Sequence, residues 1–168
     1  AGSGKSSIGR AVVDLVPSTY SIRNFEGNEG RVQFIFQDPS SALNRSHTVG
    51  RILDQVLSHH APELSAVGRK EKASALLQEV GLRPSDLSKK PKDFSGGQRQ
   101  RIGIARALAA DPTVLICDES VSALDVSVQA QVLNLLNGIK KNRGLSMIFI
   151  SHDPDVIRYM CDRIQQLS

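Results

Sequence analysis

The sequence predicts an α/β fold in which helices flank a parallel sheet and a helical subdomain is inserted into the chain. Short apolar runs of strand length alternate with longer segments whose apolar residues recur at helical spacing. This alternation is clearest in the second half of the chain. Strands that alternate with helices favour a parallel sheet, and such sheets bind ligands at the carboxyl ends of their strands.

The first part of the chain predicts one helix and one strand. Residues 4–16 are predicted to form a helix, because glycines and small hydroxyl residues open the segment and Pro17 closes it. Residues 18–30 are polar and glycine-rich, which indicates turns. The apolar run RVQFIFQ at 31–37 predicts a buried strand.

The middle of the chain is predicted to be helical, and residues 44–94 to form the inserted subdomain. Apolar residues recur at helical spacing over 49–60 and 69–80, and Gly81 is placed to end the second helix. Beyond this stretch we expect helix, strand, helix, strand and helix, at 95–110, 113–117, 126–141, 145–150 and 153–161.

Composition indicates one globular domain that spans residues 1–168 and does not bind nucleic acid. The net charge of +4 is small and the basic residues are spread along the chain, so no basic patch is predicted. With no Trp and few other aromatic residues, the chain offers no stacking platform for bases. The apolar runs are too short to cross a bilayer, so any membrane contact would be made through a partner.

The two cysteines predict neither a metal site nor a disulfide. Cys117 and Cys161 are far apart in sequence and fit no metal-ligand spacing. Cys117 lies in an apolar run and is expected to pack as a small buried side chain. A reducing compartment is therefore the default expectation.

The chain begins with AGSGKSS, which matches the second half of a P-loop. In a P-loop, backbone N–H groups at a helix N-terminus close around phosphates, Lys5 would neutralise the β- and γ-phosphate oxygens, and Ser6 would coordinate Mg²⁺. The first glycine of the motif would fall before Ala1. A Gly-Ser turn before a helix is the alternative interpretation of this half motif.

The run VLICDE, residues 114–119, predicts a buried strand that ends in two carboxylates. Asp118 is suited to holding Mg²⁺, as the aspartate of a Walker B motif. Glu119 is suited to acting as the general base that polarises an attacking water. An acidic pair that merely caps a strand is the alternative, but its position after a P-loop disfavours that alternative and indicates a P-loop NTPase core.

The run FSGGQRQR, residues 94–101, places a serine and paired glycines at the start of a helix. Paired glycines let backbone amides approach an anion closely, and Ser95 can cap the helix or donate to a phosphate oxygen. A glycine-rich helix cap without a ligand is the alternative. That alternative does not explain why Gln98 follows the glycines, or why a strand that ends in two carboxylates comes next in the sequence.

Taken together, these motifs resemble the nucleotide-binding domain of ABC transporters over essentially the whole chain. The resemblance is carried by Lys5–Ser6, Gln37, Ser95–Gln98, Asp118–Glu119, Asp125 and His152, in the family's order. It implies the ABC ATPase type of fold. It also implies ATP and Mg²⁺ as cofactors and ATP hydrolysis as the activity.

The resemblance assigns roles to particular residues. It implies ATP binding by Gly2, Ser3, Gly4, Lys5, Ser6 and Ser7, and metal contacts by Ser6, Gln37 and Asp118. It implies catalytic roles for Glu119, Gln37 of the Q-loop and the switch histidine His152. The signature residues, which contact the ATP of the opposite protomer, are Ser95, Gly96, Gly97 and Gln98. The D-loop at the dimer interface is Ser122, Ala123, Leu124 and Asp125.

Two stretches are similar to one branch of this family, the import ATPases for dipeptides, oligopeptides and nickel. They are IFQDP at 35–39, with the LN and TVG that follow, and SALDVSVQAQVLNLL at 122–136. Three positions depart from the usual pattern: Ser120 replaces a Pro, Arg45-Ser46 replaces Pro-Arg, and Phe94 replaces a Leu. We expect altered loop rigidity there rather than lost chemistry.

The resemblance implies partners and a location. We expect a second nucleotide-binding domain in a homo- or heterodimer, integral membrane permease subunits, an indirect link to a solute-binding protein, and a peripheral place on the cytoplasmic face of the plasma (inner) membrane. An ATPase that acts on ribosomes or DNA is the alternative function. We also expect the domain to be incomplete at both ends, so that residues 1–168 alone bind ATP poorly and are inactive.

Overall fold

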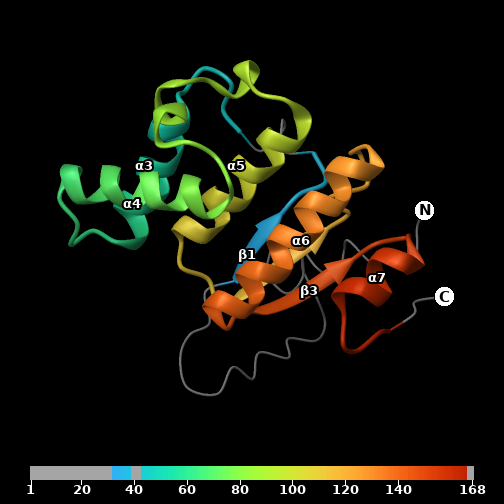
Figure 1. Ribbon diagram of the computed structural model, residues 1–168. Coiled ribbons are helices and arrows are strands. Elements are labelled where there is room, and N and C mark those ends of the chain that lie inside the picture. Colours follow the sequence, from blue (N-terminus) through green and yellow to red (C-terminus); the bar gives the residue numbers. More distant parts are fainter. Residues whose placement is uncertain (1–31, 39–42, 166–168) are drawn as a thin grey trace, which may run out of the picture.

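The computed structural model describes residues 32–38 and 43–165, and these residues form a three-stranded parallel sheet with helices packed around it (Figure 1). The strands are β1 (Val32–Ile35), β2 (Val114–Asp118) and β3 (Ser146–Ile150), in the order β1-β2-β3. The predicted parallel sheet and its α/β class are confirmed. The helix predicted at 4–16 lies outside the described residues.

The register of the strands brings their carboxyl ends to one edge of the sheet. Ile35 pairs with Cys117, and Asp118 pairs with Ile150. The central strand β2 is buried at every position, as its continuous apolar run predicts for a strand covered on both faces. Cys117 is fully buried as predicted, and its burial raises the pKa of the thiol to about 12.

Three helices pack near the sheet. They are α5 (Gly96–Ala109), which contacts β1, α6 (Val126–Arg143), which packs against α5, and α7 (Pro154–Met160), which contacts β3. Each begins where a serine or aspartate accepts a hydrogen bond from the first turn, which stabilises the helix start. The helices predicted after residue 95 are therefore present.

The stretch between β1 and α5 is helical. It contains α3 (Val49–His60), α4 (Ala66–Glu79) and the short 3₁₀ helices η1 (Pro84–Ser88) and η2 (Pro91–Asp93). Helix α4 begins at Ala66 rather than at 69, because the Ser65 hydroxyl accepts a hydrogen bond from the amide of Gly68. Gly81, with φ of +73°, follows the end of α4 as predicted.

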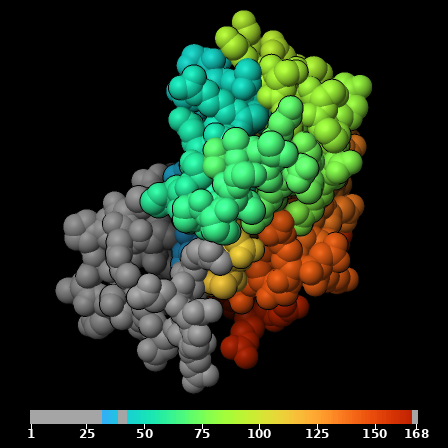
Figure 2. Space-filling view, turned by 90° about the vertical axis from the view of Figure 1, so that its left-hand side faces the viewer, coloured from blue at the N-terminus to red at the C-terminus, as the bar shows by residue number. Residues whose placement is uncertain are grey.

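One apolar core joins the helical stretch to the sheet. It includes Leu53, Leu57 and Leu77 from α3 and α4, and Leu108 and Leu115 from α5 and β2. Figure 2 shows α3 and α4 above α6 and α7 on one face of the molecule. Within the part of the chain that the structure describes, no helix has both the length and the apolar character needed to cross a bilayer.

Candidate functional site

Four of the residues predicted to act on ATP lie at the carboxyl edge of the sheet. Gln37 follows β1, Asp118 ends β2, Glu119 comes directly after it, and His152 follows β3. Because the three strands are parallel and in register, their ends meet. The predicted residues Gly2, Ser3, Gly4, Lys5, Ser6 and Ser7 lie outside the described residues.

Glu119 is held in an unusual backbone conformation and faces His152. Its φ is +46°, in the left-handed region that non-glycine residues seldom adopt. Its amide donates a hydrogen bond of 2.9 Å to the carbonyl of Ile150 on the neighbouring strand. The Nδ1 atom of His152 lies 3.3 Å from Oε1 of Glu119. Strain of this kind persists where the surroundings hold it, and it concentrates at functional sites.

Ser122 connects Glu119 to Gln37. The Ser122 amide and hydroxyl both donate to the carbonyl oxygen of Glu119, at 3.1 and 3.0 Å. The side-chain amide of Gln37 donates to the same hydroxyl oxygen at 3.2 Å. Sequence reasoning placed Ser122 in the D-loop but did not predict these contacts. No local pattern could have revealed a contact between residues 85 positions apart.

The remaining D-loop residues lead into α6. Ala123 is exposed and Leu124 is half-buried. Asp125 caps the helix, and its Oδ1 accepts hydrogen bonds from the Val128 amide at 3.0 Å and the Ser127 hydroxyl at 2.8 Å. These two bonds hold the pKa of Asp125 below its usual range. The D-loop is therefore anchored at one end by Ser122 and at the other by Asp125.

The signature residues form the N-terminus of α5. Ser95 and Gln98 make a capping box: the Gln98 amide donates to the Ser95 hydroxyl oxygen at 3.3 Å, and the Ser95 amide donates to Oε1 of Gln98 at 3.0 Å. Both side chains are exposed. The predicted capping role of Ser95 is confirmed, and Gln98 gains a structural role that sequence reasoning did not assign.

The two glycines of this turn have different surroundings. A Cβ atom on Gly97 would lie 2.3 Å from Cγ1 of Val128, so this glycine allows α5 to approach α6 closely. A Cβ atom on Gly96 would lie 3.8 Å from Leu124, an ordinary contact distance. Sequence reasoning gave both glycines to anion binding. The structure adds a packing requirement at Gly97 and not at Gly96.

The described residues fit part of a Mg²⁺ site. Asp118 is 7% exposed at the end of β2 and supplies a carboxylate, the kind of oxygen ligand that Mg²⁺ prefers. The Nε2 of Gln37 donates to Ser122, so the amide oxygen is the atom with which Gln37 would approach a metal ion. Ser6, the other predicted ligand, lies outside the described residues.

The three departures from the usual pattern lie close to this site or in the helical stretch. Ser120 is 1% exposed, directly after Glu119, and within the described residues its buried hydroxyl oxygen has no hydrogen-bond partner. Phe94 is buried, with the Lys89 ammonium 5.7 Å from the centre of its ring. Arg45 and Ser46 are exposed, and Ser46 donates twice to the Asn44 side chain. The expected change in loop rigidity stays a prediction.

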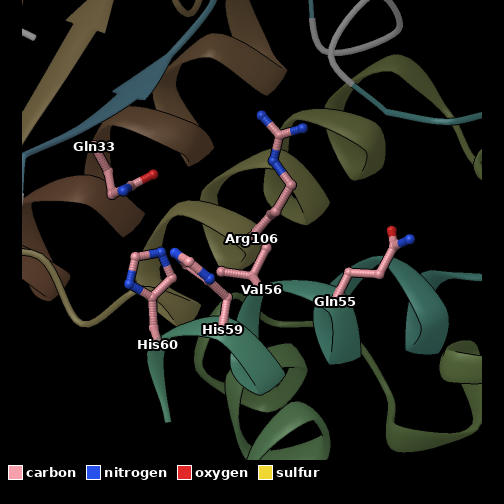
Figure 3. A pocket seen from close by; sticks show the side chains of 6 residues that line it. All are labelled: Gln33, Gln55, Val56, His59, His60 and Arg106. Atoms are coloured by element: carbon pink, nitrogen blue, oxygen red, sulfur yellow. The ribbon is translucent and has the colours of Figure 1, made fainter. Parts of the chain in front are cut away.

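A separate pocket of about 380 Å³ lies between β1, the end of α3 and α5 (Figure 3). Figure 3 shows His59 and His60 at the end of α3, and Arg106 reaching in from α5. Burial lowers the pKa of Arg106. His59 is exposed and His60 is half-buried. The pocket contains Gln33 from the first half of β1, so it does not belong to the carboxyl edge.

Comparison with known proteins shows the family to which the chain is related. Residues 1–122 match the family described as ABC transporter. The chain is 44% identical to the oligopeptide transport ATP-binding protein OppF of Haemophilus influenzae and 45% identical to the oligopeptide transport ATP-binding protein AmiF of Streptococcus pneumoniae. Both alignments cover 97% of this chain, but only 53% and 58% of the two relatives. The chain thus spans little more than half their length.

Solved structures show the same fold. The dimeric structure of a post-hydrolysis state of the ATP-binding cassette MJ0796, bound to ADP and Pi, matches with a TM-score of 0.77 and 26% identity, over 95% of this chain and 74% of that one. The structure of cbiO1 from Clostridium perfringens, part of the ABC transporter complex cbiONQ, matches with a TM-score of 0.80 and 24% identity, over 96% and 67%. This chain belongs to the ABC transporter family and has the fold of its ATP-binding cassettes.

Proposed function

We propose that the protein containing this chain binds and hydrolyses ATP to power the import of peptides. The observation that carries the proposal is the pair formed by Glu119 and His152, 3.3 Å apart at the carboxyl edge of the sheet. Gln37 and the buried carboxylate Asp118 lie at the same edge. A carboxylate beside a second proton carrier is suited to activating a water for attack on a phosphate.

The proposed chemistry divides the work among the residues at the strand ends. Glu119 polarises the attacking water as general base, and His152 holds the Glu119 carboxylate and contacts the γ-phosphate. Asp118 and Gln37, with Ser6, would hold Mg²⁺, which neutralises phosphate charge when it is bound. Gly2 to Ser7 would cradle the phosphates, with Lys5 contributing its positive charge. Catalysis is then mostly positioning and electrostatic stabilisation.

The exposed signature and D-loop residues support a dimer as the working form. Ser95 and Gln98 are exposed at the start of α5, where amide groups favour an anion. They do not lie at the strand ends, where Gln37, Asp118, Glu119 and His152 lie. Ser95 to Gln98 would therefore contact the ATP bound by a second cassette. Ser122 to Asp125 would contact that cassette directly. The dimeric structure reported for MJ0796 supports this assembly.

Integral membrane permease subunits are the second proposed partner, and they place the protein on the cytoplasmic face of the membrane. Both relatives above are oligopeptide transport ATP-binding proteins, which favours a peptide over nickel as the transported solute. The similarity of residues 35–39 and 122–136 to import ATPases favours transport over work on ribosomes or DNA.

Uptake by cells tests this function. Deleting the gene should abolish accumulation of a labelled tripeptide and leave labelled nickel uptake unchanged, and the intact gene should restore peptide uptake. The full-length protein should also co-purify with integral membrane proteins rather than ribosomes. If the deletion abolishes nickel uptake alone, the transported solute is nickel and not a peptide. If the protein co-purifies with ribosomes alone, the proposed transport function is rejected.

A further inference from the structure

We propose that Ser122 is a positioning residue whose hydroxyl couples the position of Gln37 to the backbone of Glu119. The proposal rests on the proposed function, in which Glu119 is the general base and Gln37 approaches the metal ion. Ser122 itself touches neither nucleotide nor water in this role. It acts through the two residues to which it is hydrogen-bonded.

The contacts form one continuous path between two strand ends. Nε2 of Gln37, after β1, donates to Oγ of Ser122 at 3.2 Å. That Oγ donates to the carbonyl oxygen of Glu119 at 3.0 Å. The amide of Glu119 then donates to the carbonyl of Ile150 on β3 at 2.9 Å. The path therefore runs from β1, through the turn after β2, to β3.

A hydroxyl group suits this position because it donates and accepts at the same time. Its single hydrogen is used by the Glu119 carbonyl, which leaves a lone pair to accept the Gln37 amide. An alanine would lose both contacts together. A threonine would keep both, since it carries the same hydroxyl.

Glu119 needs such support because its backbone is strained. At φ of +46° an L-residue is less stable than in the right-handed or extended regions. Three hydrogen bonds hold the residue there: one from its own amide to Ile150, and two from the amide and hydroxyl of Ser122. When Gln37 moves away from Ser122, the hydroxyl can rotate, and one of the three bonds is lost. The carboxylate of Glu119 then loses its fixed direction.

Ser122 could instead act only as an exposed interface residue, as its place in the D-loop implies. Ser127 is the matched control for that role. It is exposed in the first turn of α6, directly after the D-loop, and its hydroxyl donates to Asp125 at 2.8 Å rather than to Glu119. Replacing Ser127 removes a hydroxyl that contacts the D-loop without touching the proposed path.

A double-mutant cycle on the full-length protein tests the coupling. We expect Ser122→Ala and Gln37→Ala each to lower kcat by about tenfold with little change in KM, and the double variant to lose little more than either single variant. Ser122→Thr should restore most of kcat. When Ser127→Ala is combined with Gln37→Ala, the fold-change in kcat should equal the product of the two single fold-changes. The coupling is overturned if the fold-changes in kcat of Ser122→Ala and Gln37→Ala multiply in the double variant. It is also overturned if Ser122→Thr does not restore kcat.

Hydrogen exchange in the nucleotide-free protein tests the same path without catalysis. Gln37→Ala should speed exchange of the Glu119 and Ser122 amides by about threefold or more, and Ser127→Ala should leave both unchanged. Unchanged exchange in Gln37→Ala would overturn the proposal. A wild-type protein that does not hydrolyse ATP would reject the proposed function instead, and the exchange measurement would still decide whether Gln37 and Glu119 are coupled.

Discussion

Arg143 binds Glu79 through two hydrogen bonds, of 2.7 and 2.6 Å, and so ties α6 to the end of α4. The two side chains are 26% and 28% exposed. The Glu79 carboxylate raises the pKa of the Arg143 guanidinium, and Asp111 lies 3.7 Å away. This ion pair joins the helical stretch to α6 by a polar contact, in addition to the apolar core that joins the helical stretch to the sheet.

We expect this pair to contribute measurably to folding stability. A double-mutant cycle with Glu79→Gln and Arg143→Met should give a coupling energy of about 1 kcal/mol in urea unfolding, because the bidentate geometry is favourable and the pair is partly shielded from water. The pair of Lys140 and Asp162, with Asp162 90% exposed, is the control and should show no measurable coupling. Equal coupling in the two pairs would contradict this interpretation.

Gly97→Ala should destabilise the protein. The added methyl would lie 2.3 Å from Val128, and overpacking of this kind lowers the free energy of unfolding by about 1–3 kcal/mol. Gly138→Ala in α6 meets nothing within 4 Å and should raise it by about 0.5–1 kcal/mol, because alanine favours helix. The double variant Gly97→Ala/Val128→Ala should lose less free energy of unfolding than the sum of the losses in the two single variants. Additive costs in thermal melts would show that this contact does not limit the approach of the helices.

Asp86 should make stability depend on pH. The carboxyl is 5% exposed; the Lys89 ammonium forms an ion pair with its Oδ1 at 2.8 Å, and its Oδ2 accepts a hydrogen bond from the Arg83 amide at 3.1 Å. The Lys89 ammonium first, and then the Arg83 amide, hold the pKa of Asp86 below its ordinary value of 3.8. The ionised carboxylate therefore stabilises the fold above about pH 4, and this contribution is lost as the pH falls through the lower, folded pKa.

Asp86→Asn should accordingly be less stable than the unsubstituted protein at pH 7, and the gap should close as the pH falls below 4. Lys89→Met should weaken the pH dependence, since Lys89 is the largest cause of the lowered pKa. Urea unfolding at a series of pH values measures both effects. A gap that stays constant from pH 7 to pH 3 would be inconsistent with a lowered pKa.

His152→Ala should lower kcat by about a hundredfold, because Glu119 loses the side chain that lies 3.3 Å from its carboxylate. His59→Ala, an exposed change in α3, is the control and should leave kcat unchanged. Steady-state ATP hydrolysis by the full-length protein measures both. A His152→Ala protein with more than half of the unsubstituted rate would separate His152 from catalysis.

The sheet and the two carboxylates at its edge could be predicted because they depend on local patterns. The apolar run at 114–117 is long enough for a strand and ends in Asp118 and Glu119, so the pattern itself gives the position of the carboxylates. Gln37 and His152 were predicted from the family resemblance and not from a local pattern, and the parallel strands bring them to the same edge. Helix starts followed in the same way from capping residues such as Ser95.

The contacts between distant segments could not be predicted. Gln37 and Ser122 meet only because β1 and β2 are neighbours in register, and no residue near either one signals the pairing. The requirement for glycine at Gly97 comes from Val128 on another helix, so the motif alone suggested anion binding. The positive φ of Glu119 is likewise a tertiary effect, since glutamate has no intrinsic preference for it.

Glu119→Gln tests the central claim most directly. The amide keeps the size of the side chain but cannot act as a base, so ATP hydrolysis by the full-length protein should fall by about a thousandfold while ATP still binds and holds dimers together. Glu71→Gln, the same change on the exposed face of α4, should leave hydrolysis unchanged. Near-normal steady-state hydrolysis by Glu119→Gln would contradict the role of Glu119 as general base.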